Sequence, residues 1–283
     1  MPNYGYHLAR AEGSATRTIY RSLLPSIARR RIPESAHAEF NVFAYSGENS
    51  LPEQVASVRS FLKYVGRPNR FTIVSDGTLS DRSCRILKSI DPVISVSHFA
   101  QWVPNDLPAR VYPYLTTHPT GKQLALIMSL PVEAPTLYID SDVLFFPAAK
   151  DLIQLAENGG APAFYLADCR LSADERLWRG GEAGSGQPVN TGVLFLFEKL
   201  DWKLALRRFL DLPGLPNFFT NQTMTHLTMH TNGASPLDKR KYVLQLDDQF
   251  VYPDRYASRD LALRHYVNPV RHKFWTAIRR GVS

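Results

Sequence analysis

The alternation of apolar strands and amphipathic helices near the start of the chain is the feature that most limits its fold. Strands are expected at Phe40–Tyr45, Arg70–Ser75 and Val93–Phe99, because each is a short run of β-forming residues bounded by turn residues. Helices are expected at Pro52–Tyr64 and from the capping residue Ser80 to about Ile90. This order of elements predicts an α/β fold with a mostly parallel sheet and helices on both faces.

Two aspartates stand inside the next apolar stretch, Thr136–Phe146. Side chains two residues apart in a strand point to the same side, so Asp140 and Asp142 are expected on one face. Two buried carboxylates repel each other, and a cation removes that cost. Mn²⁺ or Mg²⁺ with a phosphorylated ligand suits the pair, and a nucleotide sugar is the leading candidate. The alternative is a structural turn, because a bare Asp-x-Asp is common.

Further polar residues stand where the first strands are expected to end. Tyr45 and Ser46 follow the first strand, and Asp76 follows the second. Ligands of doubly wound sheets bind outside the carboxyl ends of the strands, so we expect the nucleotide base and ribose beside these residues. For Asp76 a simple Asp-Gly turn is an equal alternative.

The second half of the chain offers a different set of candidates. A short strand, Phe164–Leu166, leads to Asp168, and residues 180–188 hold four glycines in nine positions. That glycine-rich segment is consistent with a mobile loop beside a ligand or with a plain surface connection. Asn190, Thr191 and Gly192 then enter a buried strand, where an amide can bind sugar hydroxyls and a glycine permits close backbone approach. Helices are expected over Glu198–Leu210 and from Thr220.

Composition excludes several classes of protein. With 283 residues and 44% hydrophobic content, the chain can bury a large core. Residues 1–40 lack the apolar core of a signal peptide, and the longest apolar runs are too short to span a bilayer. The two cysteines, Cys84 and Cys169, indicate neither a disulfide framework nor a zinc site. We therefore expect a cytoplasmic protein.

The net charge of +7 is concentrated at the two ends. Residues 1–31 hold six arginines and one glutamate (+5), and residues 261–283 hold five basic residues and no acid (+5), which leaves −3 for the middle. This distribution does not suit a nucleic-acid binder with a continuous basic face. It favours an anionic ligand near the C-terminus and peripheral contact of Arg29–Arg31 with an anionic membrane, although a solvated helix end is the simpler reading of that triplet.

The change of pattern near residue 37 suggests the domain organisation. Residues 1–36 are expected to form a basic N-terminal extension, weakly helical from Thr16 to Arg31. Residues 37–283 are expected to form the main domain, with a nucleotide-binding half at 37–150 and an acceptor and sugar half at 151–283.

Motifs spread over residues 40–275 resemble the GT-A glycosyltransferases, and within them family 8, which includes glycogenin and bacterial lipopolysaccharide galactosyl- and glucosyltransferases. The motifs are the strand-borne Leu137–Asp142, a basic residue before it (Lys122), Asn190–Leu194, the pair Asn221-Gln222, and His265 with the basic segment up to Trp275. The chain departs from the family in two places: an asparagine, Asn221, replaces an aspartate, and the last motif is two residues longer and lacks its glycine.

The resemblance implies a mixed, mostly parallel Rossmann-like GT-A sheet and a function. Asp140, Asp142 and His265 would hold Mn²⁺ on the diphosphate of a donor, with a UDP-sugar as the expected donor and a glycan or lipid-linked acceptor. Gln222 and Asp168 would lie at the sugar, which favours a retaining reaction. The residues expected at the rest of the donor are Tyr45, Ser46, Asp76, Lys122, Ser141, Asn190, Thr191, Gly192, Arg271 and Lys273.

Three alternatives stay open at the level of sequence. A metal-dependent nucleotidyltransferase would normally carry a basic glycine-rich loop after its first strand, whereas residues 46–50 are acidic. A catalytically inactive sugar-nucleotide or glycan-binding module is the non-enzymatic alternative. An inverting reaction would need a carboxylate base, for which Asp247 and Asp248 are the candidates.

Overall fold

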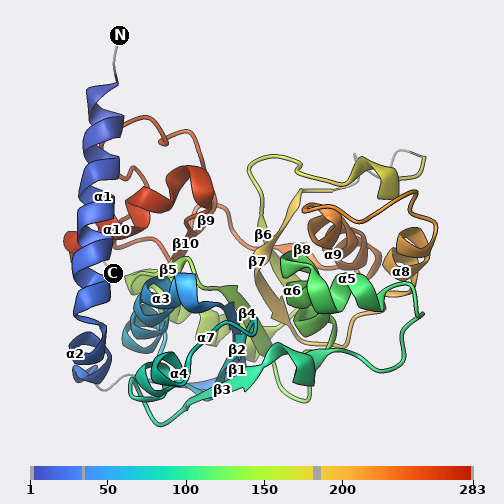
Figure 1. Cartoon of the computed structure of the whole chain (residues 1–283), viewed down its shortest axis with the longest axis horizontal. Coiled ribbons are helices and arrows are strands. Elements are labelled where there is room, and N and C mark those ends of the chain that lie inside the picture. The colour runs from blue at the N-terminus through green and yellow to red at the C-terminus, as the bar shows by residue number, and fades with distance from the viewer. Residues whose placement is uncertain (1–2, 34–35, 181–185, 282–283) are drawn as a thin grey trace.

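The computed structural model describes residues 3–33, 36–180 and 186–281. A central sheet has the strand order β3-β2-β1-β4-β7-β6-β8, and its first four strands run parallel. β7 is antiparallel to both β4 and β6, so the sheet is mixed and mostly parallel, as expected (Figure 1). Its strands are β1 His37–Ser46, β2 Arg67–Ser75, β3 Ile94–His98, β4 Thr136–Asp140, β6 Ala163–Ala167, β7 Val189–Leu196 and β8 Ser235–Pro236.

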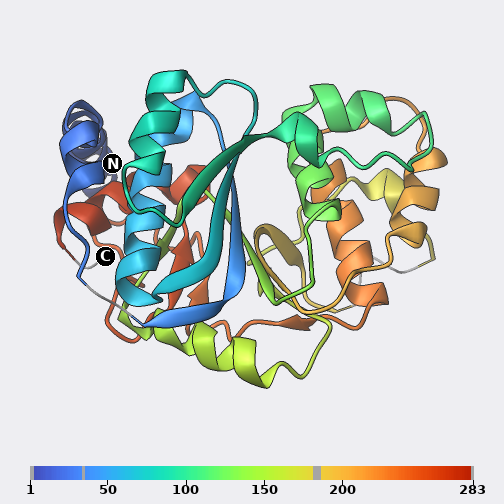
Figure 2. The same ribbon diagram turned by 90° about the horizontal axis from the view of Figure 1, so that it is seen from below.

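Apolar residues on both faces of the strands explain why helices cover the sheet on two sides. Along β1, Val42 and Ala44 face one apolar cluster while Phe43 faces another, which is the period of two expected for a strand. The first cluster contains side chains of α2, α3, α4 and α7, and the second contains side chains of α5, α6, α8 and α9. Helices accordingly lie on both sides of the central sheet (Figure 2). The central strands are therefore buried on both faces.

The helices lie close to the expected positions. Ser80 caps α4 by accepting a hydrogen bond from the backbone of Ser83, as the sequence predicted. The helix expected over Glu198–Leu210 begins only at Lys203. The bounds are α1 Tyr4–Ser22, α2 Leu24–Arg29, α3 Leu51–Tyr64, α4 Asp81–Lys88, α5 Tyr112–Thr117, α6 Pro119–Met128, α7 Asp151–Asn158, α8 Lys203–Leu210, α9 Thr220–Thr231 and α10 Arg271–Arg279. None of the helices within the described ranges is long and apolar enough to cross a membrane.

The aspartate-bearing stretch differs from its prediction in one respect. The expected continuous strand is interrupted, because β4 ends at Asp140 and a turn at Ser141 and Asp142 separates it from β5 Val143–Phe145. β5 leaves the central sheet and forms a second sheet of order β5-β10-β9, with β10 Leu263–His265 and β9 Tyr242–Val243. The turn thus carries Asp142 from one sheet to the other.

The basic N-terminal segment packs against the body of the protein. The helix expected from Thr16 to Arg31 starts earlier and breaks at Leu23, where Pro25 lies in the first turn of the next helix. α1 runs along α10 (Figure 1) so closely that a Cβ on Gly13 would lie 2.6 Å from the carbonyl oxygen of His272. Arg17 also pairs with the buried Glu53 at 2.6 Å. The glycine-rich prediction at 180–188 falls largely on residues 181–185, outside the described part of the chain.

Candidate metal and donor site

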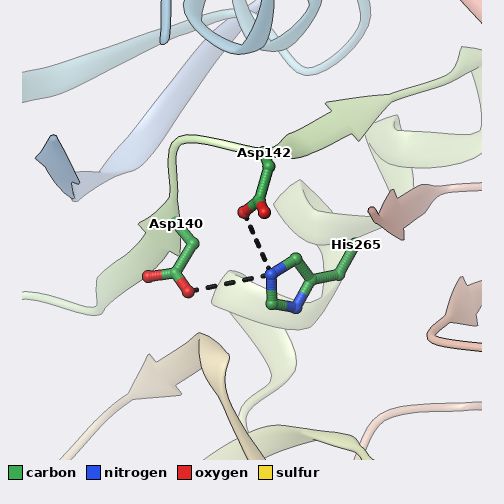
Figure 3. A group of neighbouring side chains, drawn as sticks. All are labelled: Asp140, Asp142 and His265. Carbon is green, nitrogen blue, oxygen red and sulfur yellow. Dashed lines mark hydrogen bonds and ion pairs between the residues drawn. The ribbon is translucent and has the colours of Figure 1, made fainter. Parts of the chain in front are cut away.

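The two sheets bring Asp140, Asp142 and His265 together (Figure 3). Asp140 is the last residue of β4, and Asp142 lies in the turn that follows. β10 is antiparallel to β5 with His265 opposite Val143, so the imidazole arrives next to the residue that follows Asp142. Residues 125 positions apart in sequence therefore meet because of one strand pairing.

The spacing of these three side chains suits one metal ion. His265 Nε2 lies 3.1 Å from Asp142 Oδ1 and 3.7 Å from Asp140 Oδ2. One ligand atom from each residue lies within 4.8 Å of the others. Ligands of Mg²⁺ lie about 2.1 Å from the ion, so ligands on opposite sides are about 4.2 Å apart. A small contraction would complete a two-carboxylate, one-imidazole site, and this is the one such cluster in residues 3–33, 36–180 and 186–281.

The pKa values of the two aspartates are shifted in opposite directions. Burial would raise the pKa of Asp142, but the neighbouring His265 and Arg271 outweigh it and lower that pKa to about 2. Burial, with the repulsion of Asp142, raises the pKa of Asp140 despite His265. Burial opposes protonation of His265, yet the two carboxylates raise its pKa. A bound cation would take over the neutralising role of the His265 proton and the Arg271 guanidinium.

Asn190 fixes the tautomer of His265. Its Nδ2 donates to Asp168 Oδ2 at 3.1 Å, and its Oδ1 accepts from the backbone of Gly192 at 2.9 Å, so the amide orientation is determined. The same Oδ1 is 2.8 Å from His265 Nδ1, which must therefore donate. In the neutral ring Nε2 then carries a lone pair directed at the carboxylates, and a metal ligand needs that arrangement.

Gly192 provides the space for that ring. A Cβ at this position would lie 2.2 Å from His265 Cε1 and 2.5 Å from Nδ1. The sequence prediction placed a ligand against Gly192, whereas the structure places the imidazole of His265 there. The glycine acts on the candidate metal site through the position of that ring.

Asp168 and Gln222 form the other side of the site. Gln222 Nε2 donates to Asp168 Oδ2 at 3.1 Å, and the same oxygen accepts from Asn190. Because a carboxylate only accepts, this bond directs the amide nitrogen of Gln222 towards Asp168 and its carbonyl oxygen to the opposite side. One hydrogen-bonded chain thus links Gln222 through Asp168 and Asn190 to His265.

Two supporting residues, Gln123 and Tyr138, were not among the sequence-based site residues. Gln123 Nε2 donates to Asp140 Oδ1 at 2.7 Å, and its Oε1 accepts from Asn221 Nδ2 at 2.9 Å. The hydroxyl of Tyr138 donates to the same Asp140 oxygen at 2.8 Å. Tyr138 stands two residues before Asp140 in a strand, so the period of two contained this signal. The contact of Gln123 depends on how α6 packs, and no local pattern indicates it.

The residues expected at the nucleotide gather at the same sheet edge. Tyr45 is the register partner of Asp140, and Ser46 is that of Ser75. Lys122 Nζ donates to the carbonyl oxygen of Asp76 at 3.0 Å. The carboxylate of Asp76 accepts from the backbone and hydroxyl of Thr78 at 2.8 and 2.6 Å, which is the turn alternative for this residue.

The last helix places one basic residue at the site and buries another away from it. Arg271, at the start of α10, forms an ion pair with Asp142. Lys273 is fully buried, and its ammonium donates to the carbonyl oxygens of Val251 and Pro253 at 2.8 and 2.9 Å. The prediction that Lys273 binds the diphosphate is corrected by this placement, because two positions along a helix turn the side chain by about 200°.

The reserve carboxylates for an inverting reaction lie elsewhere. Asp248 is fully buried and holds both terminal nitrogens of the equally buried Arg264, at 2.8 and 2.9 Å. Asp247 accepts from the hydroxyl of Tyr256 at 2.7 Å. Neither aspartate lines the pocket at the metal cluster. Arg264, which adjoins His265 in sequence, points away from it because neighbours in a strand alternate.

A pocket of about 380 Å³ joins the two sides of the site. Thr120, Gln123, Asn221 and two aromatic residues, Phe218 and Phe219, also line it. Of the remaining expected residues, Tyr45, Ser46, Asp76, Lys122, Ser141, Gly192 and Lys273 are not part of its lining. The expected residues in the lining are Asp140, Asp142, Asp168, Asn190, Thr191, Gln222, His265 and Arg271.

Comparison with known proteins agrees with this architecture. No family model and no curated protein sequence matches the chain. Among solved structures, the galactosyltransferase LgtC, determined with donor and acceptor sugar analogues, matches with a TM-score of 0.57 at 15% identity, over 84% of this chain and 93% of LgtC. Mouse xyloside xylosyltransferase 1 matches with a TM-score of 0.54 at 12% identity, over 83% and 99% of the two chains.

A third similar structure is the bifunctional glycosyltransferase WbbM, with a TM-score of 0.56 at 13% identity, over 87% of this chain and 50% of WbbM. At these identities the likeness concerns the fold. The resemblance to GT-A glycosyltransferases of family 8, first suggested by motifs, is therefore confirmed as a distant resemblance of structure.

Proposed function

We propose that this protein is a metal-dependent glycosyltransferase that moves a sugar from a nucleoside diphosphate donor, most simply a UDP-sugar, to a hydroxyl acceptor with retention at C1. The observation that carries the proposal is the cluster of Asp140, Asp142 and His265, which lies at the ligand edge of a glycosyltransferase fold. The hydrogen bonds of Asn190 and Gln123 support it, because they hold the imidazole and one carboxylate as a metal site requires.

Stabilisation of the leaving group is the main chemical task of such a site. Asp140, Asp142 and His265 would hold Mn²⁺ or Mg²⁺, which supplies positive charge to the departing diphosphate. Arg271 lines the same pocket and adds a guanidinium that can bind phosphate oxygens in a bidentate manner. The acceptor oxygen forms the new bond to C1, the bond from C1 to the diphosphate breaks, and the hydroxyl proton leaves with the diphosphate.

The side of the pocket opposite the metal cluster is suited to the sugar. Asp168 and Asn190 present oxygen and amide groups that can exchange hydrogen bonds with hydroxyls. Gln222 would direct its carbonyl oxygen at C1, because Asp168 already binds its nitrogen. Retention is favoured by this amide and by the position of Asp247 and Asp248 outside the pocket. Tyr45, Ser46, Asp76 and Lys122 would contact the nucleotide at the adjoining strand ends.

We also propose peripheral contact with an anionic membrane on the cytoplasmic side, through α1 and α2. Tyr4, Leu8, Ile19 and Leu23 are exposed and fall within about 100° of one another around the helix. Arg10 and Arg21 of α1 and Arg29 of α2 are exposed, and the exposed Arg30 and Arg31 follow directly after α2. An exposed apolar stripe in a basic segment is typical of helices that lie on anionic lipid surfaces.

A ligand screen tests the proposed activity. Sugar nucleotides are added to the protein with and without Mn²⁺, and the melting temperature is followed by thermal shift. A donor present at 100 times its Kd stabilises the protein by about 2.7 kcal/mol. The donor found in this way is then incubated with the protein and Mn²⁺, and the products are separated by chromatography. Release of a nucleoside diphosphate supports a glycosyltransferase. Release of a sugar 1-phosphate, by cleavage between the two phosphates, indicates a nucleotidyltransferase, and binding without turnover indicates a binding module.

A further inference from the structure

The connection between α8 and α9 exposes three large apolar side chains within five residues. Leu215 is 85% exposed, Phe218 is 65% exposed and Phe219 is 40% exposed. The rings of Phe218 and Phe219 contact each other with centroids 5.5 Å apart. Isolated exposed apolar residues are ordinary, but a group of this kind beside a cavity is typical of a binding surface.

This connection borders two cavities. Phe218 and Phe219 line the pocket at the metal cluster, while Leu215 and Pro216 line a second cavity of about 410 Å³. The facing segment at the junction of α5 and α6 does the same: Thr120 lines the metal pocket and His118 lines the second cavity. Because both walls pass from one cavity to the other, the two cavities are neighbours. Both walls belong to the end of the molecule that holds α5, α6, α8 and α9, remote from α1 (Figure 1).

The second cavity differs from the metal pocket in chemistry. No carboxylate is among its described lining residues, and apolar side chains such as Pro113, Phe209 and Leu212 predominate. Each of its polar side chains makes at least one hydrogen bond within the protein. Arg110 donates to the carbonyl oxygens of Leu210 and Leu212, at 2.5 and 2.6 Å. The lining therefore offers apolar contact rather than hydrogen bonds.

Two of the polar lining groups are bound to the wall between the cavities. The Tyr114 hydroxyl and His118 Nδ1 each lie 2.9 Å from the hydroxyl of Thr120. These bonds hold the α5–α6 junction in place and leave the ring of Tyr114 as apolar surface towards the cavity. The wall is thus a fixed element between a polar reaction pocket and an apolar cavity.

We propose that the acceptor is amphiphilic: its sugar lies over Phe218 and Phe219 beside the metal pocket, and an apolar tail, such as an alkyl chain, fills the cavity at Leu215. This inference rests on the proposed function, since it assigns the second substrate of the same site. Aromatic rings stack on the apolar faces of sugars, and an apolar cavity next to them selects an acceptor by what is attached to its sugar. Each buried methylene should raise affinity roughly fourfold.

The test measures binding of two probes to the full chain, without donor. Methyl β-D-glucopyranoside and octyl β-D-glucopyranoside, the latter below its micelle concentration, are titrated by calorimetry. The octyl glycoside should bind at least tenfold more tightly. In a Leu215→Asp variant, where the change falls on an exposed position that the fold tolerates, this preference should disappear. Phe250→Asp, which introduces the same charge at an exposed apolar residue that lines neither cavity, is the matched control and should keep it.

Each other outcome has a definite meaning. Equal affinity for the two glycosides, or an octyl preference that survives in Leu215→Asp, would overturn the proposal, because the chain would then bind elsewhere or adsorb without specificity. Donor hydrolysis without any glycoside tests the proposed function separately. Its absence with every sugar nucleotide, together with a Leu215-dependent octyl preference, would overturn the acceptor assignment and leave an apolar ligand site of another kind. Failure of the octyl preference with donor hydrolysis intact would overturn the tail site alone.

Discussion

Replacement of Gly192 by alanine should displace His265 from the metal site, although none of the three proposed metal ligands is itself substituted. The new Cβ would lie 2.2 Å from His265 Cε1, while ordinary contact begins near 3.4 Å, so the ring must move by about 1.2 Å. Overpacking of this kind typically costs about 1–3 kcal/mol in stability. Loss of the orientation of a metal ligand typically lowers metal affinity about 10- to 100-fold. We expect both effects in Gly192→Ala.

Calorimetric titration with Mn²⁺ and urea unfolding measure the two effects in the same variant. The matched control is Gly5→Ala in α1, where the new Cβ meets its nearest neighbours at 3.4 Å or more and the metal site is remote. That control should bind Mn²⁺ like the unmodified protein and unfold at an equal or slightly higher urea concentration, because alanine is the better helix former.

A double variant separates the clash from other effects of the new methyl group. In a His265→Ala background the ring is absent, so Gly192→Ala should cost little further stability, and the two changes should be coupled by about 1–3 kcal/mol. A folded Gly192→Ala protein with unchanged Mn²⁺ affinity would refute the placement of His265 in the metal site. Additive stability losses in the double variant would refute the contact itself.

Three further perturbations test separate parts of the account. Asp142→Asn should abolish Mn²⁺-dependent release of nucleotide from the donor while the protein stays folded; full turnover in excess chelator would contradict it. Burial, together with Lys273 and Arg10, lowers the pKa of His272 to about 4, so stability should fall as the pH drops from about 6.5 towards 4, where only the unfolded chain binds the proton. His272→Gln should weaken that fall in urea unfolding at a series of pH values, and an unchanged slope would count against it. Liposomes with anionic lipid should sediment the protein, and Leu8→Asp combined with Ile19→Asp should reduce this about tenfold or more; equal binding to neutral liposomes would oppose the membrane proposal.

The sequence allowed the sheet and one part of the site to be predicted because those features are local. Strand periodicity located β1, β2, β3 and β4, and parallel strands bring Tyr45, Asp76 and Asp140 to one edge wherever the helices pack. The contact of Tyr138 with Asp140 also follows from the period of two. These relations depend on spacing within one element or on a rule shared by all parallel sheets.

The remaining features depend on contacts between distant elements. The break between β4 and β5 follows from the pairing of β5 with β10. The apolar sequence around Asp142 is equally compatible with one continuous strand, so it does not predict the break. The burial of Lys273 depends on which side of α10 faces the body of the protein. The sequence alone does not indicate which of Arg264, Arg271 and Lys273 reaches the pocket. Gln123 required the packing of α6 against the end of β4. The pairing of Arg264 with Asp248 likewise joins two segments whose charges looked available for a ligand.

The most direct test of the central claim is the position of Mn²⁺ in a crystal grown with a nucleoside diphosphate. An anomalous difference map recorded at the manganese absorption edge locates the ion independently of the coordinates. The account predicts one strong peak between Asp140, Asp142 and His265, about 2.0–2.2 Å from a carboxylate oxygen and in contact with diphosphate oxygens. A nucleotide bound with no peak at these three side chains, or a peak at another group of residues, would contradict it.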